Sequence, residues 1–126
     1  MTDTPAFDIE FSPHPAGLRA RVTGEGTLAA TRGYWQAIVA RLQAQPARGL
    51  LLVDEMHGPA LSASQWQELV ADMEGQGLER VRIAHAKPRG LGAVEHCEIH
   101  AREAGFEARV FADEATADLW LRYGAT

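Results

Sequence analysis

The sequence has a single cysteine, Cys97, so no disulfide can form within the chain, a pattern typical of a reducing compartment. Basic residues are not in excess: 12 Lys and Arg stand against 17 Asp and Glu, and the net charge of −5 argues against a nucleic-acid-binding surface. No apolar run approaches the roughly 20 residues of a membrane span. The first residues also lack the basic and apolar regions of a signal peptide. We therefore expect a cytoplasmic protein with no nucleic-acid partner and no membrane span.

Length and composition predict one globular domain. The chain has 126 residues, of which 46% are hydrophobic and 23% charged, close to the averages for single soluble domains. A chain of this size buries roughly two thirds of the surface that its unfolded form exposes, which is enough for one core. We treat residues 1–126 as a single domain and expect residues 1–5 and 124–126 to be flexible ends.

Five segments have the patterns of strands. Residues 7–11 and 18–24 alternate between apolar and polar side chains on either side of the breaker-rich stretch SPHPAG, which predicts an antiparallel hairpin. Residues 50–54, LLLVD, are a continuous apolar run that ends in an acid, which is typical of a parallel strand covered on both faces. Residues 80–86 and 106–111 predict two further strands.

Helical spacing follows each of the last four strands, and the order β-β-α-β-α-β-α-β-α predicts an α/β domain. Its sheet would have five mostly parallel strands, with four helices on its faces. Ser62 or Ser64 is the expected N-cap of the second helix and Asp113 that of the last. We predict that the tryptophans are core residues and that Tyr34 and Tyr123 lie at the surface. The apolar helix positions are, in order, Trp35, Ile38, Val39 and Leu42; Trp66, Leu69, Val70 and Met73; Leu91, Val94, Cys97, Ala101 and Ala104; and Ala117, Trp120 and Leu121.

Polar residues follow two of the predicted strands. Asp54 ends the third strand and His57 comes three residues later, while Lys87 and Arg89 lie in the loop after the fourth strand. Because the carboxyl ends of parallel strands share one rim of a sheet, where ligands bind in open α/β folds, we predict a ligand- or partner-binding site there. Asp54 could pair with His57 or hold the following turn by hydrogen bonds. No Ser or Cys is spaced to complete a convincing catalytic triad.

Ser62 and Ser64 belong to the same predicted rim. Either hydroxyl could cap the second helix, a contribution of about 1 kcal/mol to stability. Either could instead accept a phosphate, which the free N–H groups of a helix N-terminus favour. We prefer the capping role.

A second polar group lies in EHCEIHARE, residues 95–103. His96 and His100 share a helix face at a spacing of four residues, and Glu103 is one turn further on the same side, so the three could hold a zinc ion. The alternative is a solvated helix shoulder, because exposed polar pairs at this spacing are routine. We prefer the shoulder and expect no cofactor.

The strand LLLVD, the segment GLERVRIAHA and the closing RVFADEATADLWL together resemble the STAS-like proteins, and more narrowly their bacterial SpoIIAA-like branch. The resemblance covers residues 7–122 and implies a small α/β domain related to anti-sigma-factor antagonists and comparable with CRAL-TRIO lipid-binding domains. In the antagonists, an Asp-Ser pair after the central strand carries a phosphorylated serine. This chain has HGPALSAS there and departs from that pattern.

Three functions are compatible with these features. The first is a non-enzymatic regulatory or binding module that presents the loops after the third and fourth strands to a regulatory protein or a small molecule. The second is a carrier of an apolar ligand, as the CRAL-TRIO comparison implies, and the third is a metal-dependent or acid/base hydrolase. The first hairpin also leaves a sheet edge through which two copies could dimerise.

Overall fold

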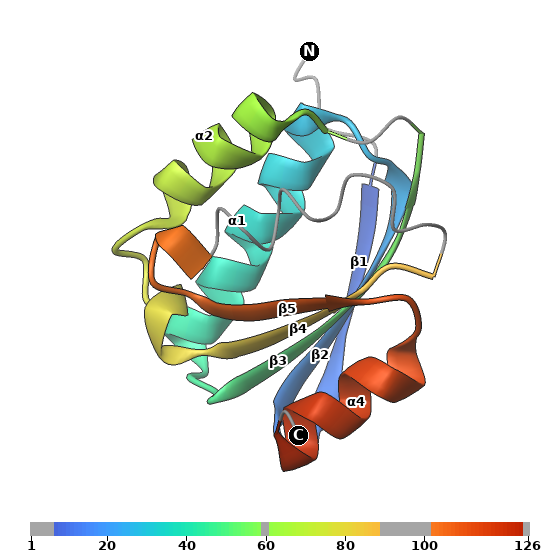
Figure 1. Ribbon diagram of the computed structural model, residues 1–126, viewed down its shortest axis with the longest axis vertical. Helices are drawn as coiled ribbons and strands as arrows, with labels where there is room; N and C mark the ends of the chain where they lie inside the picture. Colours follow the sequence, from blue (N-terminus) through green and yellow to red (C-terminus); the bar gives the residue numbers. More distant parts are fainter. Residues whose placement is uncertain (1–6, 59–60, 89–101, 125–126) are drawn as a thin grey trace.

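The computed structural model describes residues 7–58, 61–88 and 102–124. They form a sheet of five strands covered by helices on both faces (Figure 1). The strands are β1 (Phe7–His14), β2 (Gly17–Glu25), β3 (Gly49–His57), β4 (Arg82–Ala86) and β5 (Glu107–Phe111). The helices are α1 (Leu28–Ala44), α2 (Ala63–Met73), α4 (Glu114–Tyr123) and the short 3₁₀ helix η1 (Leu78–Arg80).

The sheet follows the order of the chain, β1-β2-β3-β4-β5. β1 and β2 are antiparallel, and every later pair is parallel. Parallel neighbours need a crossover connection, and α1 supplies the one between β2 and β3 while α2 and η1 supply the next. This confirms the predicted α/β class and the mostly parallel sheet with its opening hairpin.

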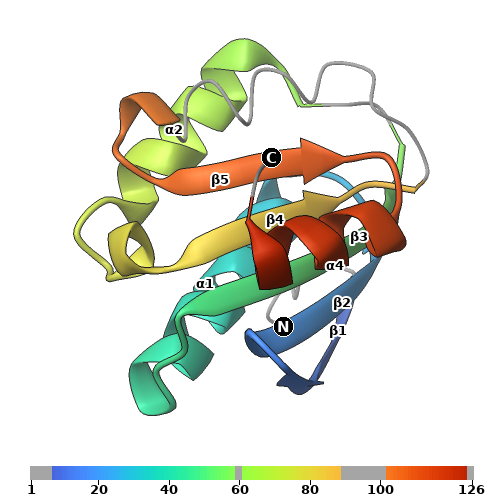
Figure 2. The ribbon, with the colours of Figure 1, turned by 60° about the horizontal axis from the view of Figure 1, so that its bottom comes forward.

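The two faces of the sheet carry separate cores. α1 and α2 cover one face and α4 covers the other, as the second view shows (Figure 2). Side chains alternate between the faces along β3: Leu50 and Leu52 pack towards α1, whereas Leu51 and Val53 pack under α4. The unbroken apolar run of β3 therefore reflects burial on both sides, as the sequence predicts. All three tryptophans are buried, which confirms that prediction too.

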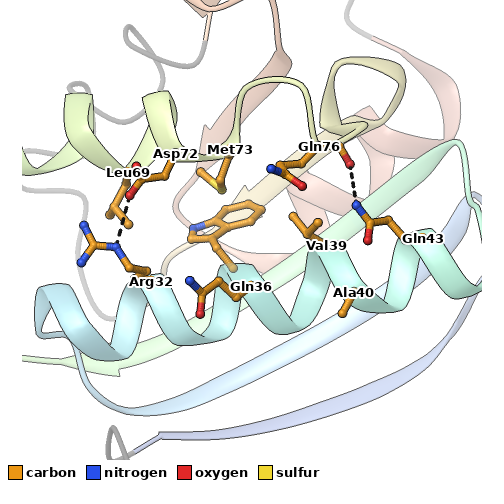
Figure 3. Close-up of a pocket in the computed structure, with 10 residues that line it drawn as sticks. Arg32, Gln36, Val39, Ala40, Gln43, Leu69, Asp72, Met73 and Gln76 are labelled. Carbon is orange, nitrogen blue, oxygen red and sulfur yellow. Dashed lines mark hydrogen bonds and ion pairs between the residues drawn. The ribbon is translucent and has the colours of Figure 1, made fainter.

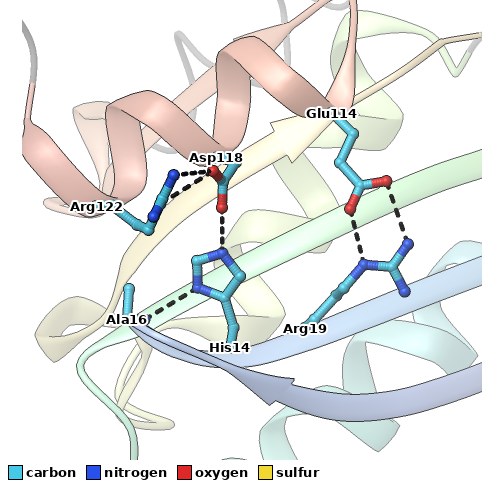
Figure 4. Close-up of polar contacts among 6 residues, drawn as sticks. All are labelled: His14, Ala16, Arg19, Glu114, Asp118 and Arg122. Atoms are coloured by element: carbon cyan, nitrogen blue, oxygen red, sulfur yellow. Dashed lines mark hydrogen bonds and ion pairs between the residues drawn. The ribbon is translucent and has the colours of Figure 1, made fainter.

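Charged contacts connect α4 to β1 and β2 (Figure 4). His14 Nδ1 accepts a hydrogen bond from the Ala16 backbone N–H at 3.0 Å, which leaves Nε2 to donate to Asp118 Oδ1 at 2.5 Å. Arg19 donates two hydrogen bonds to Glu114, at 2.8 and 3.2 Å. Because α4 follows β5 at the other end of the sheet order, these contacts orient the helix across strands to which it is not directly connected.

Three predictions about the elements need correction. β1 continues through Ser12 to His14, since an edge strand tolerates Pro13, which needs no ladder hydrogen bond on its open side. β3 does not stop at Asp54 but runs to His57, because β2 extends alongside it as far as Glu25. Tyr34, expected at the surface, is 1% exposed.

Other predictions about the helices are confirmed within the described residues. Ser62 is the N-cap of α2 and Asp113 that of α4, and Tyr123 is 70% exposed. The predicted helix around Leu91 and Cys97 lies outside the described residues, as do residues 1–5 and 125–126 of the expected flexible ends. The described chain therefore contains three α-helices where the sequence predicts four.

Candidate functional site

Asp54 is the centre of a buried polar cluster on β3. Its side chain is 3% exposed and lies one residue past Val53, which is the last β3 residue paired with β4. Its Oδ2 atom accepts hydrogen bonds from His85 Nε2 at 2.8 Å and from the Tyr34 hydroxyl at 3.3 Å. Its Oδ1 atom accepts the Met56 backbone N–H at 3.0 Å. The carboxylate is thus satisfied on both oxygens, as a buried charge requires.

The charges around Asp54 keep it ionised. Burial raises the pKa of Asp54, but the hydrogen bond from His85 and the positive charges of His85 and Lys87 outweigh that effect, so the pKa lies below its ordinary value. Lys87 Nζ is 3.7 Å from Oδ2 and 5.9 Å from the centre of the Trp66 ring. The negative charge therefore holds together three elements, namely α1 through Tyr34, the end of β4 through His85, and the loop that follows β4.

A hollow of about 470 Å³ opens at the carboxyl ends of β2 and β3. Glu25, Gly26 and Thr27 line it where β2 gives way to α1, and His57 and Gly58 line it where β3 ends. Leu28 and Leu61 supply apolar wall, and Gln65 comes from the first turn of α2. The backbone hydrogen bond from Gly26 N–H to the His57 carbonyl, at 2.7 Å, joins the two sides.

Local sequence explains this shape. Gly58 has φ +103°, a backbone conformation that disfavours any residue with a Cβ, and it turns the chain out of β3. Thr27 then caps α1 and Ser62 caps α2, each through its side-chain oxygen. Two helices therefore begin at the rim where β2 and β3 end. The sequence predicts a site at the same rim but at the loops after β3 and β4, and no described residue that follows β4 lines this hollow.

Ser62 has a defined structural role. Its Oγ accepts the Gln65 backbone N–H at 3.2 Å while the Gln65 side chain accepts the Ser62 N–H at 2.9 Å, so the two residues form a capping box. Ser64 lies in the first turn, with its Oγ 3.2 Å from that of Ser62. Both serines are exposed. The capping role predicted for one of them thus belongs to Ser62.

The structure brings together some of the predicted site residues and separates others. Asp54 and Lys87 are close to each other, and both lie at the same rim as His57. The suggested pair of Asp54 with His57 is wrong, because β3 remains extended at both residues and His57 is exposed while Asp54 bonds to His85. Arg89 lies outside the described residues.

The predicted metal site is not tested by the geometry. His96 and His100 lie outside the described residues, while Glu103 is described and exposed. Among residues 7–58, 61–88 and 102–124, no group of three His, Cys, Asp or Glu side chains is arranged to hold a metal ion.

Two residues of the buried cluster, His85 and Tyr34, were not predicted as site residues from the sequence. His85 alternates with Ile83 on β4 and with Val81 just before it, and that spacing already places His85 on a buried face, where a histidine needs a polar partner. Tyr34 lies four residues before Ile38 on the buried face of α1, so the helical spacing already indicates its burial, whereas its partner Asp54 is 20 residues away in the chain.

No family model and no curated protein matches this sequence. Within the described residues, none of the helices has the length and apolar character needed to cross a bilayer.

Proposed function

We propose that this protein is a non-enzymatic binding module of STAS-like type that receives a small polar ligand at the rim formed by the ends of β2 and β3. The observation that carries the proposal is the hollow of about 470 Å³ between the starts of α1 and α2. Its volume lies within the roughly 300–1,000 Å³ of small-molecule sites. His57 and Glu25 offer polar groups, and Leu28 and Leu61 offer an apolar wall.

The burial of the acid/base groups favours binding over catalysis. Asp54 and His85 are 3% and 2% exposed and bond to each other, so neither can reach a substrate in the hollow. A catalytic acid or base must lie within hydrogen-bond reach of the proton that it transfers. The hydrogen bonds of the cluster instead connect β3 to α1 and β4, which is a structural role.

The dimensions of the apolar interior give less support to a lipid carrier. The apolar space beside His85, bordered by Trp66 and Phe106, has a volume of about 20 Å³. That is close to the space of a single water molecule, far below that of an acyl chain.

Nuclear magnetic resonance with a library of small polar metabolites tests the proposal. We expect at least one compound to shift backbone amide signals of Glu25–Leu28 and Leu61–Gln65 together. His57→Ala should weaken that compound about tenfold, the effect of losing one good polar contact. Arg48→Ala is the matched control, because Arg48 is exposed at the opposite, amino-terminal end of β3. Perturbations that avoid the rim, or equal losses in the two variants, would contradict the proposal.

A further inference from the structure

β1 is one of the two edge strands of the sheet, and it is the longer of them. It has eight residues, whereas β5 at the other edge has five. Natural sheets tend to keep edge strands short, because their unpaired backbone N–H and C=O groups can accept a further strand. Within the described residues, β2 is the only strand that pairs with β1. The outer side of Phe7–His14, which we call the β1 edge, therefore has backbone groups to offer a partner.

The outward backbone groups belong to the odd-numbered residues of β1. In an antiparallel pair, the backbone groups of successive residues point alternately towards the partner strand and away from it. Pro13 has no N–H to give to the ladder, so its position is one that points away from β2. By the same alternation, the N–H and C=O groups that point to the open side are those of Phe7, Ile9 and Phe11.

The side chains of β1 form two rows of different chemistry. Phe7, Ile9 and Phe11 are half-buried and pack against the core beneath α1. Asp8 and Glu10 lie on the opposite face of the sheet and are exposed, the side chain of Glu10 by 76%. A strand added to this edge therefore meets an apolar row on one face and an acidic row on the other.

The acidic row is not neutralised by its neighbours. Asp8 forms no ion pair and no side-chain hydrogen bond with the described residues. Glu10 is 3.9 Å from Arg21, but the Arg21 guanidinium donates its hydrogen bond to Glu55. Three carboxylates thus share one guanidinium, and two negative charges remain uncompensated. This excess favours lysine or arginine side chains on an incoming strand.

A second copy of β1 fits this edge poorly. Antiparallel pairing of two copies about Ile9 places Asp8 of each copy opposite Glu10 of the other, and like charges directly opposite each other are destabilising. Pairing about Phe11 instead sets Pro13 opposite Ile9, where the ladder loses an N–H donor. The edge therefore favours a strand of different sequence from its own.

The fold holds β1 in position before any partner arrives. β1 pairs with β2 along its whole length, and its Phe7 ring lies so close to Gly33 of α1 that a Cβ added there would be 2.7 Å from the ring. α1 is joined in turn to α2, for example by the ion pair of Arg32 with Asp72 (Figure 3). A preformed strand loses little conformational entropy when it binds, which favours affinity.

We propose that the β1 edge binds an extended segment of a partner protein in which basic and apolar residues alternate. The segment adds antiparallel to β1 and exchanges backbone hydrogen bonds with Ile9 and its outward neighbours. Its lysine or arginine side chains face Asp8 and Glu10, while its apolar side chains extend the row beneath α1. No residue of β1 lines the hollow at the rim, so this surface is separate from the ligand site proposed there.

Three synthetic peptides of the length of β1 test the proposal. The first alternates Val and Lys, the second alternates Val and Glu, and the third is the Val-Lys peptide with methylated backbone nitrogens at its valines. We expect the Val-Lys peptide to slow hydrogen exchange of the Ile9 and Phe11 backbone N–H groups in nuclear magnetic resonance spectra. The N–H groups of Asp8 and Glu10, which already face β2, should keep their rates. The other two peptides should bind about tenfold more weakly or worse, because one carries the wrong charge and the other lacks the donors.

A pair of variants locates the charge effect. Glu10→Lys should weaken the Val-Lys peptide about fivefold, because a repulsion replaces an exposed ion pair. Glu74→Lys makes the same change in net charge at the exposed C-cap of α2 and should leave the affinity unchanged.

Four outcomes overturn the proposal. They are unchanged exchange of Ile9 and Phe11 at about 5 mM Val-Lys peptide, equal binding of the methylated or the Val-Glu peptide, equal affinities of the two variants, and protection of these N–H groups that grows with protein concentration in the absence of peptide. The last result would show that a second copy occupies the edge.

Discussion

Replacement of Asp54 should be among the most destabilising single changes in this protein. Asp54→Ala removes the acceptor for the His85, Tyr34 and Met56 donors and leaves the positive charge of Lys87 without its partner. Removing one member of a buried, hydrogen-bonded charge pair costs about 3–5 kcal/mol. Domains of this size are stable by about 5–15 kcal/mol in total. The variant should therefore lose a large part of its free energy of unfolding.

Urea denaturation followed by tryptophan fluorescence measures this loss. Asp8→Ala is the matched control, because Asp8 is exposed on β1, and it should change the free energy of unfolding by no more than about 0.5 kcal/mol. Asp54→Asn keeps the shape of the side chain and provides a milder variant if Asp54→Ala does not fold. A cost below about 1 kcal/mol for Asp54→Ala would refute the reasoning, since it would show that the three bonds add no net stability.

The lowered pKa of Asp54 also predicts how the free energy of unfolding changes with pH. The pKa of Asp54 is lowered in the folded protein, so folding favours the ionised form. Its contribution is present above the unfolded-state pKa of about 3.9 and is lost as the pH falls through the lower folded-state pKa. The difference in free energy of unfolding between the wild type and Asp54→Asn should thus shrink as the pH falls below about 4. A difference that grows on acidification would contradict the assigned ionisation.

Three smaller effects follow from the geometry. Ser62→Ala should lower the free energy of unfolding by about 1 kcal/mol through loss of the N-cap, and Ser64→Ala by clearly less, in paired thermal melts. Gly49→Ala should destabilise by more than Ser62→Ala, because its new Cβ would lie 2.8 Å from a backbone carbonyl oxygen of the β1–β2 turn; equal melting temperatures would contradict this. His14→Ala should raise the pKa of Asp118, since the His14 hydrogen bond is the main cause that lowers it; carbon-13 titration of the carboxyl group checks the direction.

Much of the architecture was predictable because it depends on short-range patterns. Period-two alternation marked β1 and β2, the apolar run marked β3, and the stripe through Ala117, Trp120 and Leu121 marked the inner face of α4. Caps are also local: a serine or aspartate three residues before its N–H partner is visible in the sequence. The shared rim followed from the parallel arrangement alone.

Long-range contacts limited the prediction of the site. Asp54 looked like the end of a strand, but the true end of β3 depends on how far β2 runs beside it. The partner of Asp54 could be sought only among nearby residues, whereas His85 is 31 positions away and meets it because β3 and β4 are adjacent. The hydrogen-bond partner of Tyr34 has the same origin, since its hydroxyl finds its acceptor on another element, although the burial of Tyr34 itself follows the helical spacing of α1.

The separate core under α4 has a consequence for protein synthesis. Leu51, Val53, Ala84 and Ala86 are covered on that face by a helix that the ribosome makes only after all five strands. Until α4 emerges, a nascent chain that has already assembled its sheet exposes these apolar side chains to solvent. Such transient exposure of apolar surface promotes aggregation. A released chain that ends after residue 113 should therefore recruit chaperones, whereas a chain that extends through residue 123 should not.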